Sequence, residues 1–162
     1  MIVEPITIAE RAALLAVATA TGLFTADEAE SLLGRILDQL ASCGLPAGHA
    51  ALACREVPGG SPVGWTYFAP DPHAEGVWNV WWLGVDPASH GTGAGWSLLR
   101  RAEAQAAADG ARLMIIETSS KDSQARARRF YGKEGYAECG RIPDFYGEGD
   151  DKVIFARRPR AA

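Results

Sequence analysis

A glycine-rich turn between an apolar segment and a helical one constrains this chain more than any other feature. Residues 77–85 are mostly apolar, glycines follow at positions 91, 93 and 95, and Trp96, Leu98 and Leu99 come next. Glycine has no Cβ, so the backbone can turn sharply and approach a ligand closely. The N–H groups and the positive dipole end of the following helix would point into the turn. The pattern predicts a strand, a turn and a helix, with a phosphate or pyrophosphate site at the turn.

Two common phosphate-binding patterns do not fit this turn. A P-loop needs Gly-Lys-Ser/Thr at the helix start, whereas this chain has Gly95-Trp96-Ser97. In a dinucleotide fingerprint that began at Gly91, the third glycine would fall on Trp96. A nucleoside triphosphate and a dinucleotide are therefore disfavoured.

Composition limits the class of protein. With 162 residues, 48% of them hydrophobic, we expect a single domain over 1–162 with an ample core. The net charge of −4 argues against nucleic acid as a partner. The three cysteines form no C-x-x-C pair, which argues against a disulfide framework and a zinc site, so we expect no metal and a reducing cytoplasm. The apolar run 12–24 is too short to span a membrane, and Arg11 is the only basic residue before it, so the positive region of a signal peptide is missing.

The remaining patterns predict a layered α/β or α+β fold with a mixed sheet. A capping box at Thr25–Glu28 opens the second helix, which ends at Gly44, and 143–151 is expected to be a loop rich in Gly and Asp. Helices are expected over about 8–20, 25–44, from the glycine turn to 109 and 123–134, and strands over 2–4, 51–57, 63–69, 77–85, 113–116, 136–142 and 152–155.

Two motifs resemble those of one family. The first is Val85-Asp86-Pro87 followed by His90-Gly91-Thr92-Gly93-Ala94-Gly95, and the second is Ala127-Arg128-Arg129-Phe130-Tyr131 followed by Gly135-Tyr136. Together they resemble the GNAT superfamily of acetyl-CoA-dependent N-acetyltransferases, in an uncharacterised bacterial branch. The resemblance covers about 77–155 and departs from the family at His90, where relatives carry Arg or Gln. It implies the GNAT fold, with about six to seven strands in a mixed central sheet and about four helices.

The resemblance also implies the donor site. Acetyl-CoA would place its pyrophosphate on the backbone of His90, Gly91, Thr92, Gly93, Ala94 and Gly95. Its pantetheine arm would lie along the backbone of Leu83, Gly84 and Val85, where one N–H would stabilise the oxyanion and Gly84 suits a bulge. Gln124 would reach the pantetheine.

The resemblance implies that Tyr131 is the general acid. A phenol with a pKa near ~10 can donate a proton to the departing thiolate, whose thiol has a pKa near ~8.5. Gln124, Ala127 and Tyr131 are spaced to share one face of a helix. By spacing alone, Tyr131 is also the residue type expected to pack a helix on a sheet.

The general base is less determined by the sequence. Trp81 and Trp82 stand where many relatives carry an acid, and Asn79 cannot take a proton. Glu117, at the end of an apolar strand, is the candidate, and a purely structural carboxylate, water, or no dedicated base are the alternatives.

Acceptor contacts are predicted at Asn79, Asp144 and Tyr146. The segment around Asp144 is acidic and aromatic, so it could steer a cationic amine, although a solvated turn would have the same composition.

We expect acetylation of a primary amine of a small molecule in the cytoplasm. The alternatives are acetylation of a protein or peptide amine, and an acyl-CoA-binding regulatory module without turnover. The oligomeric state, including a homodimer, stays open.

Overall fold

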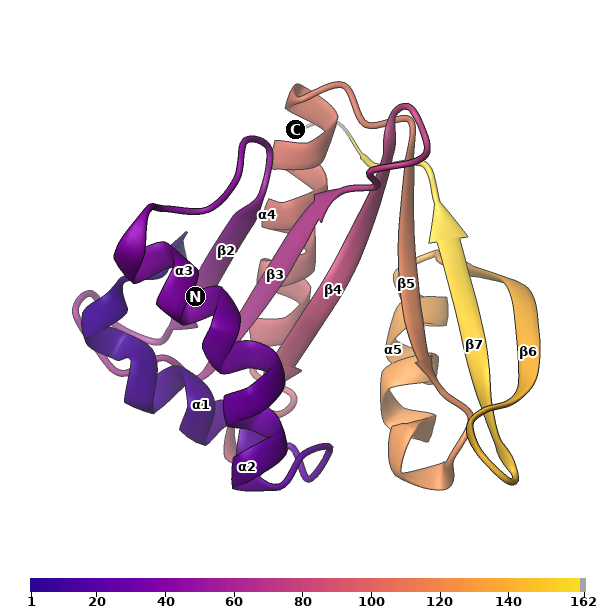
Figure 1. The fold of residues 1–162 in the computed structure, drawn as a ribbon, viewed down its shortest axis with the longest axis horizontal. Helices are drawn as coiled ribbons and strands as arrows, with labels where there is room; N and C mark the ends of the chain where they lie inside the picture. Colours follow the sequence, from indigo (N-terminus) through magenta and orange to yellow (C-terminus); the bar gives the residue numbers. More distant parts are fainter. Residues whose placement is uncertain (161–162) are drawn as a thin grey trace. The chain divides into compact units, whose positions relative to one another are not determined.

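The structure is a computed structural model that describes residues 1–160. Its strands form one mixed sheet in the order β1-β2-β3-β4-β5-β7-β6, which confirms the expected α/β architecture (Figure 1). The strands are β1 Ile2–Pro5, β2 Ala50–Arg55, β3 Gly64–Pro70, β4 Val77–Val85, β5 Leu113–Ser119, β6 Ala137–Gly147 and β7 Asp150–Arg157. The helices are α1 Arg11–Ala20, α2 Ala26–Ala29, α3 Arg35–Ser42, α4 Ala94–Ala108 and α5 Ala125–Lys133. Short helical turns lie at η1 Ile8–Glu10, η2 Glu30–Gly34, η3 Pro87–Ser89 and η4 Asp122–Gln124.

The second predicted helix is one continuous run with a π-helical stretch. Thr25 accepts the Glu28 N–H at 3.3 Å and the Glu28 carboxylate accepts the Thr25 N–H at 2.8 Å, so the predicted capping box is present. From there α2, η2 and α3 follow one another without a break. Counted in this way, the described part of the chain has the four main helices that were expected.

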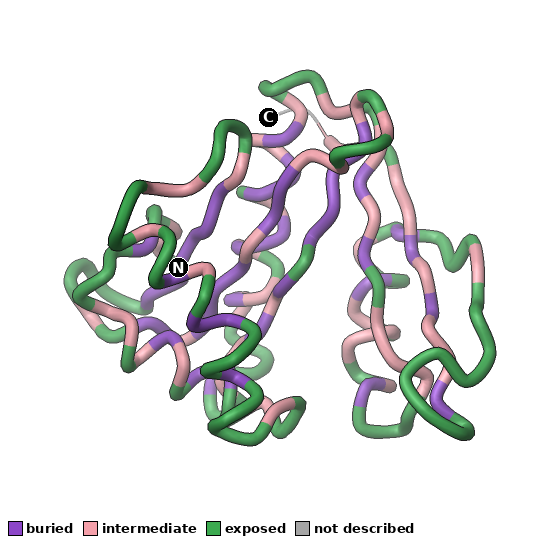
Figure 2. The backbone as a smooth tube through the Cα atoms, in the orientation of Figure 1, coloured by how far each residue is buried: buried purple, intermediate pink, exposed green. Residues whose placement is uncertain are grey.

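The chain divides into two compact units, of which the first comprises 1–69 and 82–102. In it β1, β2 and β3 pair antiparallel, and α1, α2 and α3 lie over one face of these strands (Figure 1). Leu14, Leu37 and Trp65 are fully buried in the core between helices and strands, and every residue of β2 is buried (Figure 2). The Trp65 indole N–H donates to the Leu14 carbonyl at 2.9 Å, which ties β3 to α1.

The second unit comprises 70–81 and the chain from Glu103 on. The start of β4 pairs in parallel with β5, from Val77 opposite Leu113, and β5 pairs antiparallel with β7. Parallel neighbours need a crossover, and the helix α4 lies between these two strands in the sequence. The hairpin of β6 and β7 closes the sheet, with β6 at its edge and exposed along most of its length (Figure 2).

The two strands of the hairpin are longer than predicted and cover most of 143–151. β6 runs on to Gly147 and β7 begins at Asp150, which leaves a two-residue turn. Pro143 has no N–H to give to a ladder, but an edge strand has one side without a partner and so tolerates it. The register shifts between Ile142 and Gly147 take up the irregularity.

Within the described residues, no helix is both long and apolar enough to cross a membrane.

Candidate functional site

The glycine turn lies in the first unit, between the end of β4 and α4. Asp86 opens it by accepting the Ala88 N–H at 2.8 Å, and a single helical turn, η3, follows. Gly91 and Gly93 have φ of +85° and +93°, a left-handed conformation that residues with a Cβ rarely adopt. A Cβ at either position would meet nothing within 4 Å. Glycine at these two positions is therefore explained by the backbone conformation and not by close packing.

The start of α4 leaves backbone donors without a helical partner. The Ser97 N–H donates to the Gly93 carbonyl at 2.9 Å, so the N–H groups of Ala94, Gly95 and Trp96 precede this first helical bond. With the helix dipole behind them, these groups suit an anion. Ala94 and Gly95 thus belong to the first turn of the helix rather than to the loop.

Two side chains of the turn contact backbone carbonyls of the protein itself. The Thr92 hydroxyl donates to the Ser89 carbonyl at 2.8 Å. His90 Nε2 lies 3.2 Å from the Val85 carbonyl, so the ring folds back on the end of β4. The turn therefore offers a ligand mainly backbone groups.

The end of β4 packs closely around Trp82. A Cβ on Gly84 would overlap the Trp82 indole, so close packing by itself accounts for glycine at this position. The Trp82 carbonyl accepts the Thr66 hydroxyl at 2.6 Å, and its ring contacts Phe24 and Trp65 with centroids 5.5 and 5.7 Å away. These contacts fix the segment Leu83–Val85 that leads into the glycine turn.

Tyr131 lies in the second unit, on α5, inside an aromatic cluster. Its ring centroid is 5.5 Å from that of Phe130, 5.8 Å from Phe155 and 6.4 Å from Tyr136. Burial raises the pKa of Tyr131 to about 12. The phenol is therefore protonated at neutral pH. Within residues 1–160 its hydroxyl forms no hydrogen bond. Gln124 stands at the N-cap of the same helix and is buried, seven residues before Tyr131.

Glu117 lies on the opposite face of the β5–β7 pair from Tyr131. Ile116 is paired with Phe155, which contacts Tyr131, whereas Glu117 is paired with Ile154. Successive side chains of a strand point to opposite faces, so Glu117 faces away from α5. Its carboxylate lies 2.6 Å from the Lys152 ammonium. The structure does not bring the predicted acid and the predicted base together on one face.

Asn79 and Asp71 close the turn that precedes β4. The Asn79 amide donates to Asp71 Oδ2 at 2.8 Å, and Asp71 Oδ1 accepts the His73 N–H at 2.9 Å. The hydrogen bond from the His73 N–H is the largest cause that lowers the pKa of Asp71, and the bond from Asn79 lowers it further. Asn79 is buried, and its side-chain donor is engaged within the protein.

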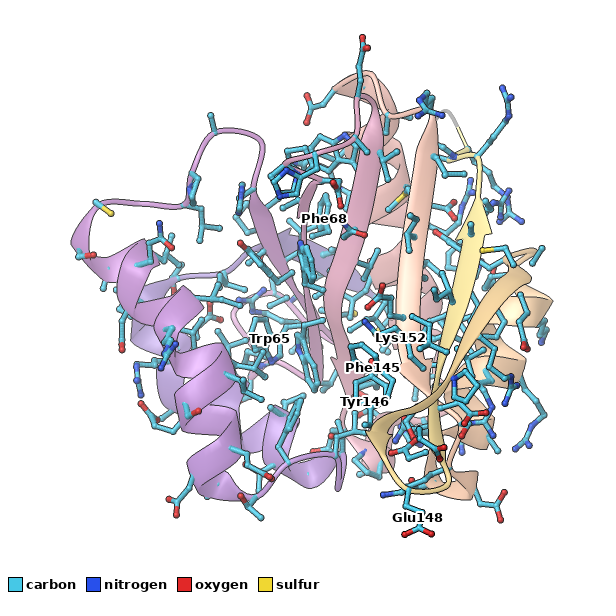
Figure 3. The ribbon with its side chains drawn as sticks, turned by 45° about the vertical axis from the view of Figure 1, so that its right-hand side comes forward. Trp65, Phe68, Phe145, Tyr146, Glu148 and Lys152 are labelled. Carbon is cyan, nitrogen blue, oxygen red and sulfur yellow. The ribbon has the colours of Figure 1, made fainter. Side chains whose placement is uncertain are left out.

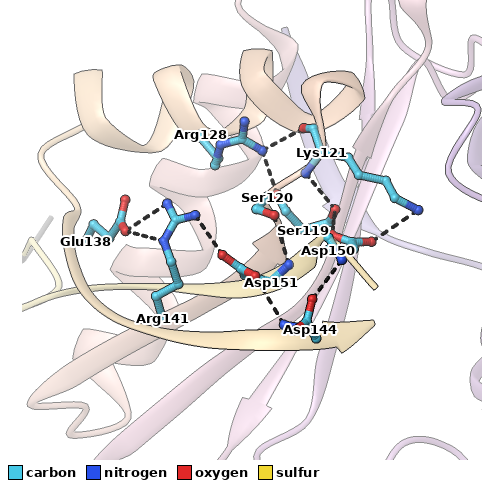
Figure 4. A network of polar contacts seen from close by, with 10 residues as sticks. Ser119, Ser120, Lys121, Arg128, Glu138, Arg141, Asp144, Asp150 and Asp151 are labelled. Carbon is cyan, nitrogen blue, oxygen red and sulfur yellow. Dashed lines mark hydrogen bonds and ion pairs between the residues drawn. The ribbon is translucent and has the colours of Figure 1, made fainter. Parts of the chain in front are cut away.

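The three aspartates of the β6–β7 turn region, Asp144, Asp150 and Asp151, bind to the protein itself (Figure 4). Asp144, with φ of +52°, accepts the Gly149 N–H at 2.7 Å and gives its own N–H to Asp151 at 3.1 Å. Asp151 also pairs with Arg141 at 3.2 Å. Asp150 is buried and accepts the Ser119 hydroxyl, which is the largest cause lowering its pKa. The carboxylate of Asp144 thus holds the turn of the hairpin in shape.

Phe145 and Tyr146 lie on the same hairpin and are about half exposed. Their rings meet edge to face, with centroids 5.0 Å apart and planes at 85° (Figure 3). The Lys152 ammonium lies 3.7 Å from the Phe145 ring centroid. Sequence reasoning gave no role to Lys152. The alternation of side chains along β7 could have indicated where Lys152 points. Val153 is buried on the helix side, so its neighbour Lys152 must point to the opposite face of the strand.

Comparisons with known proteins agree with this geometry. The family model described as Acetyltransferase (GNAT) family matches residues 18–136. A crystal structure of a GNAT-family protein from Desulfovibrio desulfuricans superposes with a TM-score of 0.90 at 26% identity, covering 98% of this chain and 99% of that one. A ribosomal-protein-alanine N-acetyltransferase from Brucella melitensis gives 0.75 at 18% identity, over 98% and 99% of the two chains. An aminoglycoside 6′-N-acetyltransferase complexed with coenzyme A gives 0.75 at 16%, over 100% and 99%. No curated protein matches this chain in sequence.

Proposed function

Because this chain belongs to the GNAT acetyltransferase family, we propose that it transfers the acetyl group of acetyl-CoA to a primary amine of a small molecule. The amine attacks the thioester directly in a ternary complex, within one domain over residues 1–162. The observation that carries the proposal is the glycine turn, in which two left-handed glycines leave open space in front of the first amides of α4. No step of this reaction calls for a metal.

The turn suits the pyrophosphate of acetyl-CoA. Of the backbone N–H groups over the stretch 90–95, at the positive end of the α4 dipole, those of His90 and Thr92 donate within the turn, and the others would bind it. Leu83, Gly84 and Val85 would pair with the pantetheine arm through their backbone, and Gln124 through its amide. A protein of the same fold that was solved with coenzyme A supports this choice of donor.

Tyr131 is the general acid of the proposed reaction. As the amine nitrogen bonds to the acetyl carbon, the C–S bond of the thioester breaks and CoA leaves as a thiolate, which needs a proton. With a pKa of about 12, Tyr131 holds its proton at neutral pH and can donate a hydrogen bond as charge develops on sulfur. The thiol is the stronger acid, near ~8.5, so the role of Tyr131 is chiefly to stabilise that charge during bond breaking.

Glu117 is the proposed base, and water is the alternative. The ion pair with Lys152 at 2.6 Å engages the Glu117 carboxylate. To accept the proton of the amine, Glu117 would have to exchange this contact for one with the acceptor. Water needs no such exchange, and the pH profile given in the Discussion separates the two.

The acceptor side is proposed to include Tyr146, whose ring is half exposed. Asn79 and Asp144 contribute by holding the turn before β4 and the β6–β7 hairpin in shape, since their polar groups are engaged there. The solved neighbours include one named for a ribosomal protein and one for aminoglycosides, so a protein or peptide amine is the alternative acceptor. The pairing of Glu117 with Lys152 favours a third candidate, an acyl-CoA-binding module without turnover.

The test is release of CoA thiol from acetyl-CoA across a panel of small amines and of peptides with free N-termini. Acetyl-CoA binding is measured in parallel by calorimetry. Turnover with small amines supports the proposal, and turnover with peptides alone would move the acceptor to proteins. Binding of acetyl-CoA without turnover on the whole panel would favour the regulatory module.

We propose the cytoplasm as the location, because Cys43, Cys54 and Cys139 are free thiols. Analytical ultracentrifugation would decide between a monomer and a homodimer.

A further inference from the structure

The Lys152 ammonium is enclosed by groups of its own hairpin and of β5 (Figure 3). It lies 2.6 Å from the Glu117 carboxylate, 3.7 Å from the centroid of the Phe145 ring and 5.9 Å from that of Tyr146. Only 14% of its side chain is exposed. Lysine on a protein surface usually keeps its charged end in water, so this enclosure calls for an explanation.

The enclosure is a product of the strand register. Lys152 pairs with Ser119, which places it diagonally across from Glu117 on the face of β5 and β7 that points away from α5. On its other side Lys152 pairs with Ile142, and the register shift that follows brings Phe145 and Tyr146 to the ammonium. A comparison within the chain shows that an ion pair alone does not enclose a lysine. Lys121 pairs with Asp150 at 3.4 Å and its side chain remains 60% exposed.

A carboxylate beside two aromatic rings is the set of groups that recognises an organic ammonium ion. The faces of aromatic rings carry negative potential and attract alkylammonium groups, and a carboxylate adds direct charge pairing. Phe145 and Tyr146 stand almost perpendicular to each other, so they form two walls rather than one flat surface. Without Lys152 this arrangement would carry the uncompensated charge of Glu117.

We propose that Glu117, Phe145 and Tyr146 form an organic-ammonium binding site and that Lys152 is its built-in occupant. The protein's own ammonium neutralises the carboxylate and covers the ring faces. The site therefore excludes a second positive charge of an incoming molecule, such as the distal ammonium of a diamine. The occupied site selects for amines that carry no second cation at this position.

The first test measures the site without any reaction. Tetramethylammonium chloride, which cannot be acetylated, is titrated into the full chain while the ring signals of Phe145 and Tyr146 are followed by NMR. Lys152→Met keeps the apolar stem and removes the charge, so we expect it to bind the probe at least about tenfold more tightly than the wild type does. Lys133→Met, which removes an exposed lysine at the end of α5, should behave as the wild type. Adding Phe145→Leu to Lys152→Met should abolish the gain.

A second measurement needs no variant. Protons above an aromatic ring are shifted upfield, so the Cε protons of Lys152 in the wild type should resonate upfield of those of Lys133. Unshifted Lys152 signals would overturn the proposal, and so would equal affinity of the wild type and Lys152→Met for tetramethylammonium. Lys152→Arg retains the charge and should stay closed to the probe.

The consequence for acceptor choice rests on the proposed function and is tested separately. Relative to a monoamine of equal length, Lys152→Met should raise kcat/KM for a diamine by about tenfold or more. Absence of turnover in every variant would refute the proposed function and leave the binding result standing. Turnover with an unchanged preference would refute the role of Lys152 in selection.

Discussion

Removing the hydroxyl of Tyr131 is the most direct test of the proposed chemistry. Tyr131→Phe keeps the ring and its contacts with Phe130, Tyr136 and Phe155, and removes only the donor. The hydroxyl forms no hydrogen bond within residues 1–160. The free energy of unfolding should therefore stay within about 0.5 kcal/mol of the wild type at neutral pH.

The expected loss in rate follows from the hydrogen bond that Tyr131 would donate to the thiolate. Hydrogen bonds to charged groups contribute about 1.5–3 kcal/mol, and about 1.4 kcal/mol corresponds to a factor of ten in rate. We expect kcat to fall by about 10- to 150-fold. The KM for acetyl-CoA should change little, because the thiolate charge develops only as the thioester bond breaks.

Steady-state thiol release at saturating amine measures both constants, and Tyr136→Phe is the matched control. Tyr136 is a buried tyrosine of the same cluster whose hydroxyl contacts the Met114 sulfur at 3.9 Å. Its substitution should cost about 1 kcal/mol of stability and leave kcat within about twofold. A Tyr131→Phe enzyme with kcat within about twofold of the wild type would refute the role of Tyr131 as the acid. Equal losses in both variants would assign the effect to packing.

Three further predictions follow from the same description. Burial raises the pKa of Tyr131 to about 12, so the stability that its neutral phenol confers is full below about pH 10 and falls by roughly 3 kcal/mol as the pH rises to about 12. Urea unfolding at about pH 9 and about pH 11.5 measures this loss, and Tyr131→Phe should be less sensitive to alkali. Gly93→Ala forces a Cβ onto a left-handed residue, so it should cost about 1–2 kcal/mol of stability and raise the Kd for acetyl-CoA about tenfold. The control Gly132→Ala, in α5, should do neither. Equal affinities of Gly93→Ala and the wild type in calorimetry would contradict the binding of acetyl-CoA at the glycine turn. If Glu117 is the base, Glu117→Gln should lower kcat by about 10²-fold or more and flatten the fall in rate at low pH, and a wild-type pH–rate profile would leave water as the base.

The sequence predicted the parts of this molecule that depend on local conformation. Gly91 and Gly93 are left-handed because a tight turn into a helix requires it, and the pattern of glycines indicates this directly. The capping box at Thr25 is equally local. The strands of the last hairpin were predicted to end at 142 and to begin at 152, which is too short, because Pro and Gly usually end strands. The position of β6 at the edge of the sheet, which makes Pro143 acceptable, depends on the whole topology.

The side-chain partners at the candidate site could not be predicted in the same way. Lys152 and Glu117 lie 35 positions apart (152 − 117), and only the register of β5 and β7 brings them together. Asp144 was assigned to the acceptor from its charge, but its carboxylate accepts a backbone N–H across the turn. Composition indicated acidic residues in this region without showing which bonds already satisfy them.

The β5–β7 strand pair carries the proposed proton donor and the proposed ammonium site on opposite faces. The backbone separates the Tyr131 cluster from Lys152 and its aromatic walls. A substitution at Phe145 or Lys152 leaves the rings that hold Tyr131 in contact with the same neighbours. On the proposed function, the hairpin residues can therefore change to suit a new amine while Tyr131, the proposed proton donor, keeps its packing. In this arrangement, divergence in acceptor chemistry need not be accompanied by compensating changes around α5.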